Sequence, residues 1–209
     1  MPQPPTLKVA EIFPSLQGEG LRQGEPTIFV RLTGCNLRCA FCDTKYAWEE
    51  GKYYSVEKVL ERIQAIRKNF PAGWVCLTGG EPLCQDLSSL VSALKKKKLS
   101  LQLETNATFF QPLAVDWYSI SPKPPQYYFR SEYREKAREV KVIVTRELEI
   151  NTMRKLRESF PLKTPLILQP QSSLKWSIKA AYVLTTRALK EGLGNVRLSV
   201  QLHKVCHFR

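Results

Sequence analysis

Short apolar runs alternate with amphipathic stretches along most of the chain. The runs are rich in Val, Ile and Leu and are bounded by Gly, Pro, Ser or Asn, a composition typical of β-strands. In one of them Leu99, Leu101 and Leu103 alternate with polar residues, as on a strand that buries one face. We expect strands over residues 28–32, 74–78, 99–104, 115–120, 140–145, 166–169 and 196–202.

The stretches between these runs place apolar residues at spacings of three and four, which predicts amphipathic helices. Ser55 precedes the first of them and Asp86 the second, and both residue types are favoured N-caps. We interpret each apolar stripe as the helix face that packs against a sheet. The stripes are Val56, Val59, Leu60, Ile63 and Ile66; Leu87, Leu90, Val91 and Leu94; Ile150, Met153, Leu156 and Phe160; and Ile178, Ala181, Tyr182, Thr185 and Leu189.

The alternation of strands and helices predicts an α/β fold with a mainly parallel sheet. About six strand–helix units are too few for the eightfold barrel of about 250 residues, so a partial barrel or an open doubly wound sheet fits. In either fold, functional residues follow the carboxyl ends of strands. No repeat or linker divides the sequence, and we therefore expect a single domain over residues 1–209.

Composition excludes several classes of protein. Of 209 residues, 43% are hydrophobic and 24% are charged, which argues against a disordered, collagen-like or disulfide-scaffold chain. No apolar run reaches the roughly 18–20 residues of a transmembrane helix, and the first residues lack the pattern of a signal peptide. We expect a cytoplasmic protein without a membrane partner.

The charge is strongly basic. Thirty-two Lys and Arg against nineteen Asp and Glu give a net charge of +13, which suggests an anionic partner. Part of the excess is local, because Lys95–Lys98 follows an apolar stripe and is interpreted as the solvated end of a helix. We find no nucleic-acid-binding module, so no nucleic-acid partner is required.

Three of the six cysteines are clustered. Cys35, Cys39 and Cys42 form a C-x3-C-x2-C pattern directly after the strand expected at residues 28–32. Three thiolates bound to a cubane cluster leave the fourth iron open to another ligand, whereas a structural zinc site needs a fourth ligand nearby. The spacing favours an iron–sulfur cluster over zinc.

Two motifs in order resemble the radical S-adenosylmethionine (SAM) superfamily. The first is the cysteine triplet, with the aromatic Phe41 before Cys42, and the second is Thr78-Gly79-Gly80-Glu81-Pro82 after the next parallel strand. The resemblance implies that the open iron chelates SAM and that an electron from the cluster cleaves it to a 5′-deoxyadenosyl radical. It also implies that Glu81 binds the methionine ammonium of SAM. Glycines at 79 and 80 permit a close backbone approach.

Further motifs resemble one family of that superfamily, the 7-carboxy-7-deazaguanine synthases, over about residues 8–204. They are residues 11–20, 29–37, 42–44, 121–123, 168–170 and 201–204. The resemblance implies ring contraction of 6-carboxy-5,6,7,8-tetrahydropterin to 7-carboxy-7-deazaguanine with loss of ammonia, in queuosine biosynthesis. It further implies Mg²⁺, a partial (β/α)6 TIM-like barrel and a homodimer. An acidic flavodoxin or ferredoxin would suit the basic charge as the electron donor.

The same resemblance assigns residues to ligands. Arg31 is expected to pair with the substrate carboxylate through two parallel hydrogen bonds. The cluster takes Cys35, Cys39 and Cys42, and Mg²⁺ takes Thr44 with oxygens of substrate and water. The expected pterin-binding residues are Leu16, Gln17, Gly18, Glu19, Arg31, Thr78, His203 and the C-terminal Arg209. The expected SAM-binding residues are Gly80, Glu81, Ser121, Pro122, Lys123, Gln169, Pro170, Gln171 and Ser172.

Two other functions are kept open. A glycyl-radical-enzyme activase is also a small radical SAM protein, but it needs neither the Gln17–Gly20 element nor Asp43-Thr44. A basic RNA-binding module with a structural zinc would explain the charge, but it lacks a fourth zinc ligand near the triplet. Metal analysis separates the radical SAM interpretation from the RNA-binding module, since about four irons per chain indicate the cluster and one zinc indicates the module.

Overall fold

The computed structural model describes residues 5–208. Within them, contacts along the chain define two compact units. Unit 1 comprises residues 5–16, 25–105 and 109–117, and unit 2 comprises residues 17–24, 106–108 and 118–208. The expectation of a single domain stays a prediction. No helix in the described residues is long and apolar enough to cross a membrane.

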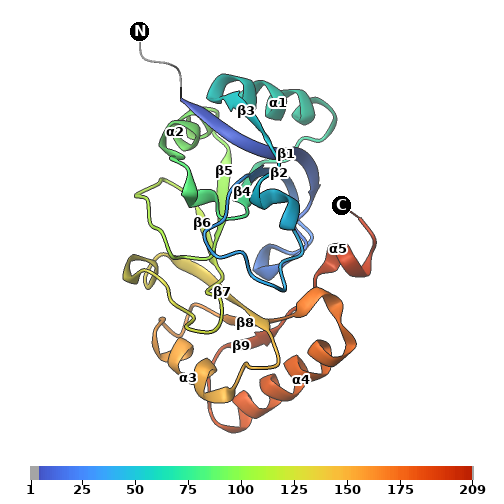
Figure 1. Ribbon diagram of the computed structural model, residues 1–209, viewed down its shortest axis with the longest axis vertical. Helices are drawn as coiled ribbons and strands as arrows, with labels where there is room; N and C mark the ends of the chain where they lie inside the picture. The colour runs from blue at the N-terminus through green and yellow to red at the C-terminus, as the bar shows by residue number, and fades with distance from the viewer. Residues whose placement is uncertain (1–4, 209) are drawn as a thin grey trace. The chain divides into compact units, whose positions relative to one another are not determined.

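Unit 1 contains strands β1 (Thr6–Leu16), β2 (Pro26–Leu32), β3 (Lys52–Ser55), β4 (Trp74–Gly79) and β5 (Ser100–Thr105) and helices α1 (Val56–Asn69) and α2 (Ser88–Lys96). The strand order is β3-β1-β2-β4-β5. β2, β4 and β5 run parallel, as predicted, whereas β1 is antiparallel to both of its neighbours. Helix α1 connects β3 to β4, and α2 connects β4 to β5 (Figure 1).

Unit 2 contains most of β6 (Trp117–Ile120), together with β7 (Ala137–Val144), β8 (Leu166–Pro170), β9 (Val196–Leu198), α3 (Ile150–Glu158), α4 (Lys175–Lys190) and α5 (Leu202–Val205). The strands run parallel in the order β6-β7-β8-β9. Helix α3 joins β7 to β8, and α4 joins β8 to β9 (Figure 1). Both units therefore repeat the predicted alternation of strand and helix.

The structure confirms Ser55 as the N-cap of helix α1. The Ser55 hydroxyl accepts a hydrogen bond from the Lys58 amide at 3.2 Å, which satisfies one of the unpaired amides of the first turn. Val59 and Ile63 are buried on the face that was predicted to pack. In α2, Asp86 accepts from the Ser88 amide at 2.9 Å, but the helix begins at Ser88, later than expected.

Several predicted strand boundaries are wrong; β7, for example, begins at Ala137 rather than at residue 140. The run at 196–202 forms a strand only to Leu198, because the amides of Lys204 and Val205 turn back onto the Gln201 carbonyl and begin α5. The run at 115–120 becomes a strand only at Trp117, since the Asp116 side chain accepts from the Leu101 amide at 2.8 Å.

The predicted packing face of α4 is also wrong. Ala181 is buried, but Ile178, Tyr182 and Leu189 are 38%, 65% and 64% exposed. Small residues, Ser177, Ala181 and Ala188, form the buried face instead. They let the helix axis approach β8 and β9, and this displaces the larger apolar residues of the stripe to the surface.

The sequence did not predict β1 as a strand. Leu7, Val9 and Phe13 are buried, and the Phe13 ring stacks on Phe29 of β2 with 5.2 Å between centroids. Cys76 completes this cluster and is fully buried, so it is a core residue. The long strand brings Glu11 beside Arg31 in the β1–β2 register.

Candidate active site

The cysteine triplet lies on the loop that follows β2. Cys35, Cys39 and Cys42 are partly exposed and form no disulfide among the described residues, and the Cys42 amide donates to the Cys39 carbonyl at 3.0 Å. No three His, Cys, Asp or Glu side chains among residues 5–208 are grouped to hold a single metal ion. A cubane cluster instead binds each thiolate through a different iron. Three thiols on one short loop, none of them in a disulfide, fit that cluster.

The Gly-Gly-Glu motif is joined to the cysteine loop through the backbone. The Gly80 amide donates to the Leu32 carbonyl at 3.2 Å, and the Glu81 amide donates to the Gly34 carbonyl at 2.7 Å. A Cβ on Gly80 would overlap the Gly34 carbonyl and lie 2.8 Å from the Cys35 Cβ. Glycine is therefore required at position 80 because the two loops touch there.

Glu81 is fully buried at the end of this motif. Its Oε1 accepts hydrogen bonds from the Leu83 amide at 3.0 Å and from the Thr105 hydroxyl at 2.8 Å. These bonds fix a carboxylate one residue after the glycine that touches the cysteine loop. Thr105, at the end of β5, was not predicted from the sequence.

Arg31 and Thr78 lie side by side, because they are register partners on β2 and β4. The Arg31 Nε donates to Glu11 Oε1 at 2.8 Å, and the Tyr46 hydroxyl donates to the same oxygen at 2.6 Å. Burial alone would lower the pKa of Arg31, but Tyr46 and Glu11 hold it above its ordinary value. Thr78 donates to Glu104 at 3.1 Å. Arg31 makes no further hydrogen bond in the described residues, which leaves its terminal nitrogens for a ligand.

Thr44 follows the cysteine loop. Its hydroxyl lies 3.6 Å from the Cys42 sulfur. Thr44 occupies the N-cap position of the 3₁₀ helix Lys45–Trp48 without a side-chain capping bond. Its hydroxyl is therefore not used as a cap.

In unit 2, Glu19 is held by two side chains. Lys141 Nζ donates to Glu19 Oε2 at 2.7 Å, and Gln201 Nε2 donates to Oε1 at 2.8 Å. Burial alone would raise the pKa of Glu19, but the charge and hydrogen bond of Lys141, with help from Gln201, lower it to about 2. Glu19 is thus a carboxylate at neutral pH.

The other predicted residues of this loop lie close to the C-terminal segment. Gln17 is buried and accepts from the Glu19 amide at 3.2 Å. The Gly18 carbonyl accepts from the Leu202 amide at 2.8 Å, and a Cβ on Gly18 would overlap the His203 ring. His203 lies in the short helix α5. Arg209 lies outside the described residues, and Leu16 is exposed at the end of β1.

The predicted SAM residues of unit 2 form two local groups. Ser121 donates to the Lys141 carbonyl at 2.9 Å and accepts from Lys123 Nζ at 2.5 Å, directly before Pro122 breaks the strand. Gln169 is buried at the end of β8, and its Oε1 has no partner among the described residues. The Gln171 amide, just after Pro170, donates to Ser177 Oγ at 2.8 Å. Ser172 has a positive φ of 46°.

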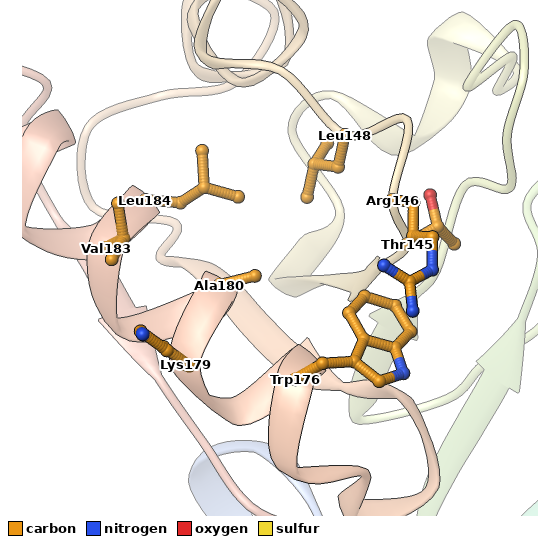
Figure 2. A pocket seen from close by; sticks show the side chains of 8 residues that line it. All are labelled: Thr145, Arg146, Leu148, Trp176, Lys179, Ala180, Val183 and Leu184. Atoms are coloured by element: carbon orange, nitrogen blue, oxygen red, sulfur yellow. The ribbon is translucent and has the colours of Figure 1, made fainter.

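A surface groove of about 410 Å³ in unit 2 contains none of the predicted site residues (Figure 2). Its most distinctive contact is the Arg146 guanidinium, 4.5 Å from the Trp176 ring centroid. The groove is lined by Thr145, Arg146, Leu148, Trp176, Lys179, Ala180, Val183 and Leu184.

Sequence reasoning missed the residues that hold the site residues in place. Glu11, Tyr46, Thr105 and Lys141 were not assigned. A signal was present for Lys141, because a charged residue at an alternating position of a strand that is otherwise Val-rich must be satisfied inside the protein. For Glu11 no signal was available, since β1 itself was not predicted.

The chain is similar in sequence and in structure to proteins of known family. The sequence model of the Radical SAM superfamily matches residues 29–173. A 7-carboxy-7-deazaguanine synthase of Synechocystis sp. is 35% identical over 94% of this chain and 90% of its own length. The 7-carboxy-7-deazaguanine synthase of Escherichia coli K12 is 32% identical over 94% of this chain and 96% of its own length. The crystal structure of QueE from Escherichia coli covers 95% of both chains at a TM-score of 0.78 and 30% identity.

The fold, the thiol triplet and the Gly-Gly-Glu motif thus define a radical SAM enzyme, with an α/β partial barrel of the radical SAM type. Membership of that superfamily implies SAM and a [4Fe–4S] cluster as cofactors, and a reductant. Within it, the chain belongs to the 7-carboxy-7-deazaguanine synthase family and is a radical SAM lyase. A glycyl-radical-enzyme activase and a zinc-dependent RNA-binding module are therefore not favoured.

Proposed function

We propose that this chain converts 6-carboxy-5,6,7,8-tetrahydropterin to 7-carboxy-7-deazaguanine with loss of ammonia, as a step in queuosine biosynthesis. The observation that carries the proposal is the backbone connection of the Gly-Gly-Glu motif to the cysteine loop, with Glu81 to Gly34 at 2.7 Å. It supports the assembly of the two cofactor motifs as one unit. The family relationship supports the choice of substrate.

Cys35, Cys39 and Cys42 would hold the cluster, and Gly80 and Glu81 would hold the methionine end of SAM. When bound, these cofactors supply reductive cleavage of SAM and hydrogen-atom abstraction from the substrate. Glu81 would accept from the ammonium group of SAM, since its carboxylate is already oriented by Leu83 and Thr105. Ser121, Pro122, Lys123, Gln169, Pro170, Gln171 and Ser172 are proposed to bind the rest of SAM.

Arg31 would bind the substrate carboxylate. Its Nε is engaged by Glu11, so its two terminal nitrogens can donate in parallel to one carboxylate. Thr78, its register partner, would add a hydroxyl beside it. The pterin ring would be bound by Leu16, Gln17, Gly18, Glu19 and His203, with Glu19 accepting from ring N–H groups because it is ionised.

Mg²⁺ is proposed to bind at Thr44, with water and substrate oxygens as the remaining ligands. The hydroxyl is suited to this because it caps no helix. An acidic flavodoxin or ferredoxin would be attracted to a chain of net charge +13. We further propose a homodimer located in the cytoplasm, where thiols stay reduced.

The direct test supplies the anaerobically reconstituted protein with SAM, reductant, Mg²⁺ and 6-carboxytetrahydropterin. We expect 7-carboxy-7-deazaguanine by mass spectrometry and about four irons per chain. If 5′-deoxyadenosine forms without that product, the proposed substrate is wrong and the radical SAM chemistry stands. If an intact cluster gives neither, the proposed function itself fails.

A further inference from the structure

Glu139 is a buried acid to which neither the motifs nor the proposed chemistry give a function. It lies on β7, two residues before Lys141, and is 0% exposed. Its Oε2 accepts from the Leu21 amide at 2.6 Å, whereas Oε1 has no hydrogen-bond partner in the described residues. A buried carboxylate held by one amide is costly, so its presence calls for a specific use.

The amide that Glu139 binds belongs to the 3₁₀ helix Gly20–Arg22, whose N-cap residue is Glu19. An N-cap side chain ordinarily accepts a hydrogen bond from the second or third residue of its own helix. Leu21 is that second residue. Glu19 makes no such bond, because Glu139 already accepts from Leu21 from a different strand.

Because Glu139 caps the Leu21 amide, the Glu19 carboxylate is not needed as the cap of its own helix. Its two oxygens turn instead to Lys141 and Gln201, at 2.7 and 2.8 Å. Strand β7 thus provides a side-chain partner for each of two residues of this segment: Glu139 for the Leu21 amide and Lys141 for the Glu19 carboxylate. Gly20 has a positive φ of 70°, and a Cβ there would overlap Glu139, so the turn is fitted closely to the acid.

We propose that Glu139 is a positioning residue for substrate binding: it caps the Gly20–Arg22 turn so that the Glu19 carboxylate is held toward the pterin. The inference rests on the proposed function, in which Glu19 binds the substrate. Without Glu139, the Leu21 amide is unpaired, and Glu19 is the nearest residue of the right type to cap it. Glu19 would then turn away from Lys141 and from the ligand.

The test compares Glu139→Ala and Glu139→Gln with the wild type as reconstituted enzymes. We expect Glu139→Ala to raise KM for 6-carboxytetrahydropterin about tenfold, the loss typical of one hydrogen bond to a charged group, with kcat changed less than about twofold. Glu139→Gln keeps an acceptor for Leu21 and is expected to restore most of the affinity. SAM cleavage in the absence of substrate and iron content should not change in either variant.

A double-mutant cycle separates this positioning from a general loss of folding. In a Glu19→Ala background, Glu139→Ala is expected to add little further loss, because the carboxylate that it positions is already gone. Binding of 7-carboxy-7-deazaguanine, measured by calorimetry, should show the same pattern without turnover. If Glu139→Ala does not fold, Glu139→Asp is used, because its shorter side chain cannot span to Leu21.

Two results would overturn the inference. One is an unchanged KM in Glu139→Ala or Glu139→Asp. The other is an equal loss of substrate affinity from Glu139→Ala whether or not Glu19 is present. Failure of the wild type to turn over the pterin would overturn the proposed function as well, so the two failures are told apart by the wild-type control.

Discussion

Arg31 donates its Nε hydrogen to Glu11 across 2.8 Å, and this pairs a strand that the sequence predicts with one that it does not. The bond engages the Nε edge of the guanidinium and does not use its two terminal nitrogens. Tyr46 donates to the same Glu11 oxygen. If Arg31 binds the substrate carboxylate as proposed, it does so with a guanidinium that is already oriented, which lowers the entropic cost of binding.

Replacing Arg31 should separate substrate binding from cofactor chemistry. Arg31→Ala is expected to lower kcat/KM for the pterin at least a hundredfold, the loss of a bidentate charged contact of about 3 kcal/mol. SAM cleavage without substrate should stay near wild type. Arg31→Lys keeps the charge without the fork and should recover little. An equal fall in uncoupled SAM cleavage would show that Arg31 does not serve the substrate.

Gly80 is expected to be essential for cluster assembly. An added Cβ would overlap the Gly34 carbonyl and approach the Cys35 Cβ to 2.8 Å, so Gly80→Ala should displace the cysteine loop. We predict a loss of at least half of the iron bound per chain after anaerobic reconstitution. Gly73→Ala is the matched control, since nothing lies within 4 Å of a Cβ at that position. Equal iron content in both variants would contradict the prediction.

Stability should fall in acid because of Glu19. Its pKa is about 2 in the folded chain against an ordinary value of 4.5, so the ionised pair stabilises the fold above about pH 4.5 and is lost as pH falls toward 2. The shift corresponds to roughly 3 kcal/mol. Thermal midpoints measured from pH 7 to pH 3 should fall more steeply in wild type than in Glu19→Gln. Parallel curves would refute this source of acid sensitivity.

Lys141→Met is expected to lower the stability of the fold at neutral pH. It leaves the Glu19 carboxylate buried without its cation, which typically costs 3–5 kcal/mol. We expect a lower midpoint of unfolding at pH 7 and partial recovery in the double variant Lys141→Met/Glu19→Gln. Absence of recovery would mean that Lys141 stabilises the fold through other contacts.

Magnesium dependence should depend on Thr44. Thr44→Ala removes the proposed hydroxyl ligand, whereas Thr44→Ser keeps it. The alanine variant is expected to need at least tenfold more Mg²⁺ for half-maximal product formation, and the serine variant should resemble wild type. The measurement is a Mg²⁺ titration of turnover. Identical titrations for all three proteins would exclude Thr44 as the ligand.

Features made by residues close together in the sequence could be predicted from it. The cysteine triplet, the Gly-Gly-Glu motif and the Ser55 cap are local patterns, and the structure places them as expected. Burial on α4 was predicted wrongly, because periodicity finds an apolar stripe but not which side faces the sheet. Ala181 and its small neighbours pack there instead of Tyr182.

Residues that orient the site were harder to predict, because they depend on register between distant segments. Glu11 reaches Arg31 only through the β1–β2 pairing, and Lys141 reaches Glu19 across more than a hundred positions of sequence. Neither neighbour can be inferred from spacing along one strand. The short helix at His203 was missed for a related reason, since its first amide bonds to Gly18.

The Gln23 side chain has a practical consequence for handling the protein. Its amide donates to the Gly18 carbonyl at 3.0 Å and to the Val200 carbonyl at 2.9 Å, so the loop of residues 17–24 and the last segment of the chain are tied together. A label or tag that displaces the segment around Val200 would therefore also disturb the loop that carries Gly18 and Glu19. Labels for purification or spectroscopy therefore belong away from both of these tied segments.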